Sequence, residues 1–250
     1  MERKEGDAAL ESRLRDAVRL SASGRARFFG FLDEREADAA KRLAARESLP
    51  NVRLWGGYAG AERVLFGAFP DFLEPEDGAF PIAAVTAAYR ARDRLSHRDF
   101  LGALLNAGIE RRAVGDILVG EGRCVFFCRG EIAGFLLSQV EKIGGVGVRL
   151  TRGYDGPLPQ AHRFADWHAA VASARVDCVV AAAVSTSRTK AAELVRSGLV
   201  QINHETVVSP DSAVREGDGI SVRGKGRYVL DRVGPLTKKG RLSVRGRKYL

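Results

Sequence analysis

The sequence predicts an α+β protein in three parts, of which the last carries most of the positive charge. Apolar residues switch several times along the chain between a helical period and a strand period. Residues 175–250 hold 15 Lys and Arg against 7 Asp and Glu, a balance of +8, whereas residues 1–174 hold 25 against 24, a balance of +1. The 250 residues, 45% of them hydrophobic, can bury more than one core.

The first part, residues 1–79, is expected to form two helices and a β-hairpin. Asp7 is the expected N-cap of the first helix. Asp33 begins the second helix, because Glu36 follows it at capping-box spacing. The period then becomes strand-like in two runs separated by turn residues, which predicts a hairpin. The expected elements are helices over 7–23 and from Asp33 onward, and strands over 52–55 and 64–69.

The middle part, residues 80–151, shows the most regular alternation of elements. Ser96 is expected to cap its first helix, with Asp99 at capping-box spacing. The predicted order is β-α-β-β-α-β, which is the ferredoxin-like arrangement. The expected elements are strands over 81–89, 114–119, 123–128 and 146–150, and helices over 96–107 and 131–143.

A linker is expected over residues 152–170, where Gly and Pro gather, and a basic domain follows over 171–250. Ser187 is the expected N-cap of this domain's second helix, which Gly198 closes. We expect two helices packed on a small twisted sheet. The expected elements are helices over 176–184 and 188–197, and strands over 200–203, 206–208, 220–222 and 228–230.

The positive charges of the basic domain form three clusters that suit phosphate groups. The helix that starts at Arg188 presents free N-terminal amides, and Lys190 adds a second charge in the same turn. Arginine can also hold a phosphate through two parallel hydrogen bonds. The clusters together favour an RNA-binding surface over a set of charges that only contact water. The cationic candidates are Arg188, Lys190 and Arg196 in this helix, Arg223, Lys225 and Arg227 in a Gly-containing loop, and Lys238, Lys239 and Arg241 in a third cluster.

Short motifs in the same region resemble the S-four RNA-binding domain, also called the alpha-L motif. The residues that carry the resemblance are Arg175-Val176-Asp177, Ser187-Arg188 with Ala191, Gly198-Leu199-Val200, Ile202-Asn203 and Gly217-Asp218. The resemblance implies that Arg175 and Arg188 contact RNA, and it adds Ser187 and Asn203 to the candidates. His204 departs from the pattern, which has Gly after the Asn.

Nearly the whole chain resembles the YlmH family of bacterial proteins with such a domain. The matching segments are 56–58, 60–63, 96–102, 115–118, 221–224, 226–227 and 237–240. The resemblance implies a cytoplasmic factor that binds rRNA and tRNA on the large ribosomal subunit. It also implies a role in the rescue of stalled large subunits that still carry peptidyl-tRNA. We expect a monomer that needs no cofactor, DNA or membrane.

Other chemistry is less well supported by the residues. In the run Ser96-His97-Arg98-Asp99, the His-Arg-Asp part also occurs in kinases. No Gly-rich phosphate loop accompanies it, so we interpret the run as a helix cap. An RNA-modifying enzyme, similar to a pseudouridine synthase or a methyltransferase, remains the alternative, although its motifs are not found. A protein-interaction scaffold is the third possibility. In the strand over 123–128, at least one of Phe126 and Phe127 is expected in the core, because adjacent strand residues face opposite ways. The middle part is expected to be a structural or protein-contact module.

The cysteines and histidines predict neither a disulfide framework nor a metal site. Cys124, Cys128 and Cys178 are odd in number, which fits a reducing compartment, and the first two are expected to be small buried apolar residues. The four histidines show no ligand spacing with them; they are His97, His162, His168 and His204. No stretch reaches the roughly 18 apolar residues that span a bilayer, and the charged start argues against a signal peptide.

Overall fold

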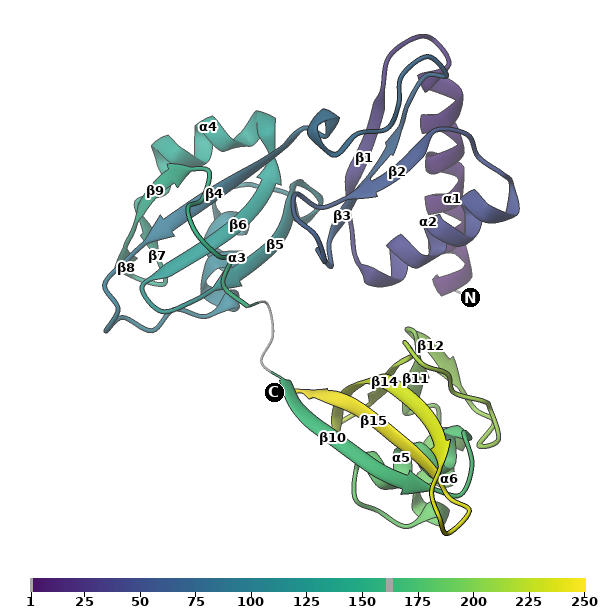
Figure 1. The fold of residues 1–250 in the computed structure, drawn as a ribbon. Helices are drawn as coiled ribbons and strands as arrows, with labels where there is room; N and C mark the ends of the chain where they lie inside the picture. Colours follow the sequence, from purple (N-terminus) through teal and green to yellow (C-terminus); the bar gives the residue numbers. More distant parts are fainter. Residues whose placement is uncertain (1, 161–163) are drawn as a thin grey trace. The chain divides into compact units, whose positions relative to one another are not determined.

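The computed structural model describes residues 2–160 and 164–250, with side chains from residue 8 onward. Its internal contacts divide the chain into two compact units, residues 1–161 and 162–250. Figure 1 shows that the strands and helices of each unit form sheets and layers within that unit, the second unit having a single sheet. The sequence prediction of a mixed α+β protein is confirmed.

The N-terminal part of the first unit packs two helices on a three-stranded antiparallel sheet in the order β1-β3-β2 (Figure 1). Its core includes Leu14, Leu43 and Phe66, one from each helix and one from the central strand. The predicted hairpin is β2–β3, whereas β1 was not predicted. The elements are α1 (Glu2–Ser21), β1 (Arg27–Leu32), α2 (Glu34–Arg46), β2 (Val52–Trp55) and β3 (Val64–Ala68).

Strand β1 could not be predicted from the sequence pattern because it is buried on both of its faces. Phe31 packs in one hydrophobic cluster, whereas its neighbour Leu32 packs in another. Adjacent residues of a strand point to opposite faces, so a strand between two cores shows no alternation of polar and apolar residues.

The helix starts in this part were predicted with unequal success. The capping box at α2 is confirmed: Asp33 Oδ1 accepts from the backbone N–H of Glu36 at 2.8 Å, and Glu36 Oε2 accepts from that of Asp33 at 3.0 Å. The N-cap expected at Asp7 is wrong, because α1 begins at Glu2 and Asp7 lies within the helix. The Asp7 side chain lies outside the described residues. Residues 2–5 are strong helix formers, so nothing stops the helix before Asp7.

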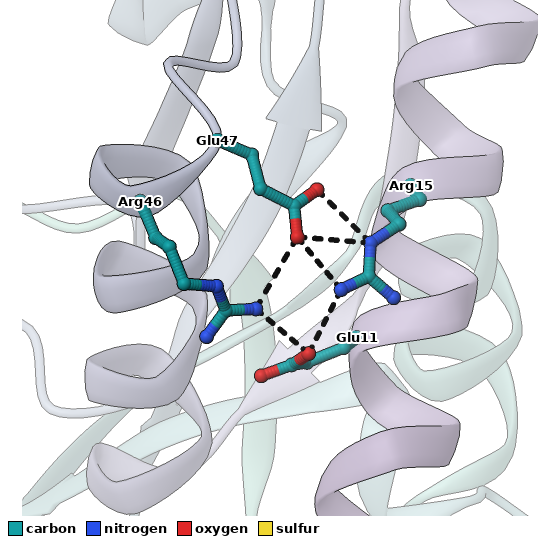
Figure 2. A network of polar contacts seen from close by, with 4 residues as sticks. All are labelled: Glu11, Arg15, Arg46 and Glu47. Atoms are coloured by element: carbon teal, nitrogen blue, oxygen red, sulfur yellow. Dashed lines mark hydrogen bonds and ion pairs between the residues drawn. The ribbon is translucent and has the colours of Figure 1, made fainter.

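Four charged side chains join α1 to the end of α2 (Figure 2). Arg15 Nη2 lies 2.7 Å from Glu47 Oε1 and 2.9 Å from Glu11 Oε2. Arg46 Nη2 contacts the same two carboxylates at 3.2 and 2.9 Å. Hydrogen bonds from Arg15, and then from Arg46, lower the pKa of Glu47 to about 2 from its usual 4.5, despite an opposing effect of desolvation.

The Glu47 carboxylate is therefore expected to make the N-terminal part acid-sensitive. A lowered pKa in the folded state stabilises the fold above the ordinary pKa, and this contribution is lost as pH falls from 4.5 to about 2. Glu47→Gln should melt earlier than wild type at neutral pH, and the gap should close as pH falls through that window. Thermal melts monitored by circular dichroism across this pH range test the prediction. A gap that stays constant with pH would contradict it.

The middle part forms a four-stranded antiparallel sheet in the order β5-β6-β4-β9 (Figure 1). In chain order, α3 connects β4 to β5 and α4 follows β6 and precedes β9. This is the predicted ferredoxin-like topology. Phe100, Leu104 and Leu136 of the helices are buried in one cluster with strand residues. The elements are β4 (Ile82–Ala88), α3 (His97–Asn106), β5 (Val114–Val119), β6 (Arg123–Arg129), α4 (Gly130–Gln139) and β9 (Arg149–Arg152), with short 3-10 turns η1 (Asp77–Ala79) and η2 (Arg111–Ala113).

The end of this part differs from the prediction. Helix α4 stops at Gln139, and a small hairpin of β7 (Lys142–Ile143) and β8 (Val146–Gly147) follows, so the expected helix over 131–143 and strand over 146–150 are wrong in their bounds. Gly144 and Gly145 adopt positive φ angles of +53° and +82°, which a turn requires and most residues resist. Ile143 is still buried in the core of this part together with Leu136 and Val140. The spacing of these three apolar residues is that of a helix face, which is why the sequence predicts a helix as far as residue 143.

The second face of the same sheet is covered by the N-terminal part. Phe126 packs under the helices, whereas its neighbour Phe127 packs with Phe31 and Leu65, so both phenylalanines are buried. The Tyr58 ring stacks on Phe127 at a centroid distance of 4.9 Å. The prediction that at least one of the two phenylalanines lies in the core is confirmed. An RRM domain binds RNA with this face of its sheet, and here the chain itself occupies it.

A buried carboxylate ties the loop after β2 to β5. Asp116 accepts hydrogen bonds from the Tyr58 hydroxyl at 2.7 Å and from the backbone N–H groups of Glu62 and Arg63 at 2.8 and 3.0 Å. The Arg63 guanidinium donates to the carbonyl oxygens of Phe31 and Val114. The segments 56–58 and 60–63, which carry the YlmH resemblance, therefore meet a third such segment, 115–118, in a structural contact.

The second unit is a six-stranded antiparallel sheet in the order β10-β15-β14-β13-β11-β12 (Figure 1). Helices α5 and α6 pack on one face, where Val179, Val195, Leu230 and Val244 are fully buried. The elements are β10 (Phe164–Val171), α5 (Val176–Ala183), α6 (Arg188–Arg196), β11 (Val200–Ile202), β12 (Glu205–Val207), β13 (Gly219–Val222), β14 (Gly226–Leu236) and β15 (Leu242–Tyr249).

Strands β10 and β15 were not predicted, and all of β10 except its last residue, Val171, lies in the segment 152–170 that was expected to be a linker. All eight residues of β10 pair with β15, from Phe164 opposite Tyr249 to Val171 opposite Leu242. Alanine and aspartate in β10, and glycine and lysine in β15, weaken the strand signal, because these residue types have little β propensity. Tertiary pairing supplies what the local sequence lacks.

Candidate nucleic-acid interface

Two of the predicted RNA-contacting arginines meet at one buried carboxylate. Arg175 precedes α5, and its Nε and Nη2 donate to the Asp177 carboxylate at 3.1 and 3.2 Å. Arg188 begins α6, and its Nε donates to the same carboxylate at 3.0 Å. The Asp177 side chain is 4% exposed, whereas those of Arg175 and Arg188 are 39% and 55% exposed. We call this group, Arg175, Asp177 and Arg188, the arginine clamp.

The electrostatics of the arginine clamp follow from this geometry. Burial acts to raise the pKa of Asp177, but hydrogen bonds from Arg175 and Arg188 outweigh it and lower the pKa. Asp177 therefore stays ionised at neutral pH and holds both guanidinium groups in place. Each arginine has N–H groups beyond those that contact Asp177. A fixed pair of half-exposed guanidinium groups suits a ligand with negatively charged oxygens.

Helix α6 adds its own N-terminus to the arginine clamp. Ser187 accepts a hydrogen bond from the backbone N–H of Lys190 at 3.3 Å, which confirms the predicted cap. Lys190 is exposed in the first turn, next to Arg188. Arg175 therefore lies beside the start of α6, which also carries Ser187, Arg188 and Lys190.

Arg196 and the turn over 223–227 lie elsewhere on the second unit. Arg196 ends α6, roughly 12 Å along the helix axis from its start. The backbone N–H of Arg223 donates to the carbonyl of Leu199 at 2.9 Å, which places the turn beside that end of α6. Arg223 and Lys225 are exposed there, and Gly224 and Gly226 adopt positive φ angles of +74° and +118°.

The third cationic cluster, Lys238, Lys239 and Arg241, lies in the turn between β14 and β15. Strand β14 has 11 residues, so this turn is about 33 Å along the strand from Gly226. The chain leaves β10 at Val171, which pairs with Leu242 beside this turn, and reaches Arg175 four residues later. The topology thus places this turn at the end of the sheet from which the chain leads to the arginine clamp. The predicted candidates cover two regions rather than one compact patch.

Asn203 has a structural partner on both sides of its amide. Its Nδ2 donates to Asp218 Oδ1 at 2.8 Å, and its Oδ1 accepts from the backbone N–H of Gly219 at 2.8 Å. Asn203 and His204 form the turn between β11 and β12 with φ angles of +49° and +66°. This backbone explains why the S-four pattern has Gly after Asn, and it shows that His can take the same conformation at that position.

The remaining motifs have structural explanations. Ser96 and Asp99 form a complete capping box at α3, as interpreted from the sequence. Cys124 and Cys128 are buried thiols, as predicted, and burial raises the pKa of both, that of Cys128 to about 12. Within residues 2–160 and 164–250 no three His, Cys, Asp or Glu side chains gather where they could hold a metal ion. His162 lies outside those residues.

The fold of the second unit and the arginine clamp define the class of protein. A helix pair on an antiparallel sheet, with basic residues at the start of the second helix, is an S4-type RNA-binding domain, and residues 175–220 match the S4 domain family. Residues 75–154 match the family described as "Putative RNA-binding domain in YlmH". In the described part of the chain, no helix combines the length and the apolar character needed to cross a membrane.

The chain belongs to the YlmH family of S4-domain proteins. It is 30% identical over 247 residues to the ribosome-associated protein quality control protein P2 of Bacillus subtilis (strain 168), a match that covers 97% of this chain and 95% of that protein. Its fold is similar to that of the cell division protein ylmH from Streptococcus pneumoniae, with a TM-score of 0.53 and 22% identity. That match covers 62% of this chain and 93% of the other.

Proposed function

We propose that this protein is a non-catalytic factor that binds rRNA and tRNA on the large ribosomal subunit and acts in ribosome-associated quality control. The arginine clamp is the observation that carries the proposal. It fixes two guanidinium groups beside the N-terminus of α6, in a domain whose family binds RNA. The name of the Bacillus subtilis relative, which this chain matches over nearly its whole length, supports the ribosome as the place of action.

The proposed RNA contacts fall into two regions of the second unit. The arginine clamp and Lys190 would hold the backbone of a folded RNA, because oriented guanidinium groups and helix amides both bind phosphate oxygens. The turn over 223–227, at the other end of the sheet, would hold a separate stretch of RNA backbone. Contact with about five phosphates would lower the logarithm of the affinity with log salt at a slope of roughly −3.5 to −4.5.

The first test follows the protein in lysates separated on sucrose gradients at low and moderate salt. Wild-type protein should migrate with the large subunit, less so at the higher salt. Lys190→Glu, which reverses an exposed charge beside the arginine clamp, should weaken this binding about tenfold, the equivalent of one charge-assisted contact. Arg188→Glu should weaken it further, although it also places a second carboxylate beside Asp177.

Arg25→Glu is the matched control, because it reverses an equally exposed charge in a loop of the first unit. It should leave the gradient profile unchanged. Wild-type protein that stays at the top of the gradient at both salts would refute ribosome binding. In that case, nucleoside modification of purified tRNA and rRNA by the protein would favour the RNA-modifying alternative.

A further inference from the structure

The sheet of the second unit has an outer face that its helices do not cover. Strands β10, β15 and β14 lie side by side along it (Figure 1). In β10, Trp167, Ala169 and Val171 pack toward the helices, whereas Phe164, Asp166 and His168 alternate with them and are exposed. We call this exposed side of β10, β15 and β14 the outer sheet face. Most of it lies beyond residues 175–220, which match the S4 domain.

One row across the outer sheet face combines aromatic rings with arginines. Phe164 and Tyr249 are paired in register, and their ring centroids lie 4.8 Å apart in an edge-to-face arrangement. The Arg227 guanidinium lies 4.8 Å from the Tyr249 ring centroid, and that of Arg247 lies 5.0 Å from the Phe164 ring centroid. Phe164 is 39% exposed, which is unusual for a large apolar ring on a sheet.

A second row on the same face is cationic. His168 pairs with Arg245 in β15, and Arg245 pairs with Arg232 in β14. This row lies four residues along β10 from Phe164, or about 13 Å. The two rows and the residues between them hold two acids, Asp166 and Asp231, and four arginines, which are Arg227, Arg232, Arg245 and Arg247. Asp231 forms an ion pair with Arg247 at 2.7 Å. The outer sheet face is therefore net positive.

We propose that the outer sheet face binds an unpaired segment of RNA, with bases stacked on the row of Phe164, Tyr249 and Arg227 and phosphates over the row of Arg245 and Arg232. Exposed aromatic rings and guanidinium groups are surfaces on which a nucleobase can stack, and single-stranded RNA is bound by such rings beside cations. A duplex hides the faces of its bases, so this site selects unpaired nucleotides. The inference rests on the proposed function in that both assign RNA to the second unit.

The test uses the full chain and a short uridine-rich RNA oligonucleotide that carries one 2-aminopurine, a base whose fluorescence is quenched by stacking. Wild-type protein should bind this probe and quench it. The double variant Phe164→Leu and Tyr249→Leu keeps apolar side chains but removes both rings. It should bind the probe roughly tenfold more weakly and quench it much less, in keeping with the usual contribution of base stacking.

Phe72→Leu is the matched control, because Phe72 is 79% exposed in the first unit and should not affect the probe. The fluorescence of Trp167, which packs in the core of the second unit, reports whether the double variant is folded. If that variant is unfolded, Arg245→Ala with Arg232→Ala provides the second reading, and the same loss of affinity is expected.

The outcomes separate this inference from the proposed function. If the oligonucleotide is bound and quenched equally by wild type and by both double variants, while Lys190→Glu still loses the large subunit, the outer sheet face is not an RNA site and the proposed function stands. If wild type ignores the oligonucleotide but the ring variant loses the large subunit, the face contacts a protein, which also overturns the inference. If wild type binds neither, the proposed function fails with it.

Discussion

Replacing Asp116 with alanine is expected to lower the free energy of unfolding of the first unit by about 3 kcal/mol. Asp116 is 7% exposed, and its carboxylate accepts three hydrogen bonds. Without it, the Tyr58 hydroxyl and the backbone N–H groups of Glu62 and Arg63 lose their acceptor. Buried donors left without an acceptor cost more than the net value of the bonds they made.

The two tryptophans allow this effect to be measured in one unit at a time. The chain has only Trp55 and Trp167, and one lies in each unit. In a Trp167→Phe background, urea unfolding followed by Trp55 fluorescence reports on the first unit. Glu121→Ala, an exposed acid in the hairpin between β5 and β6, should shift stability by no more than about 0.5 kcal/mol. Equal curves for the two variants would show that Asp116 does not hold the loop.

Replacing Asp177 with alanine is expected to separate specific RNA binding from general attraction to polyanions. The variant loses the carboxylate that orders Arg175 and Arg188, so binding must fix two mobile arginines, at roughly 0.5–1.5 kcal/mol each. Affinity for purified large subunits should fall about tenfold. Affinity for poly(U) should stay the same or rise, because the variant gains one unit of positive charge.

The stability cost of this variant should be smaller than that of Asp116→Ala. The Asp177 side chain is buried, but both arginines are about half exposed and can be hydrated once it is gone. We expect a loss of about 1–2 kcal/mol, measured through Trp167 in a Trp55→Phe background. Glu205→Ala, which also removes one acid from the second unit, is the control for net charge. If both variants change the two affinities alike, the arginine clamp does not order RNA-binding arginines.

The first unit cannot bind RNA in the manner of an RRM, because the sheet face that an RRM uses is buried here. That mode uses the open face of a four-stranded sheet, and here Phe127, Tyr58 and Leu65 bury that face. An RNA contact by residues 75–154 would need a different surface, such as the start of α3, where Arg98 is exposed. The second unit shows the opposite case, because β10, β14 and β15 form an open face that combines rings and arginines.

The local features of this protein were determined by the sequence itself. Capping boxes at Asp33 and Ser96, and the cap at Ser187, depend on residues three positions apart, so they could be predicted and are confirmed. The ferredoxin-like order of the middle part follows from hydrophobic period alone. The positive charge of the last third is a property of composition, and it favours RNA as the ligand whatever the fold.

Only the tertiary structure decided how distant segments pair. Strand β1 lacks the alternation that marks a strand, because it lies between two cores. Strands β10 and β15 carry alanine, aspartate, glycine and lysine, which weaken the local signal, so they form through their pairing with each other. The convergence of Arg175 and Arg188 on Asp177 depends on how α5 packs against α6. The approach of Phe164 to Tyr249 spans 85 residues of chain and depends on sheet register. Such contacts join residues far apart in sequence, and no local pattern encodes them.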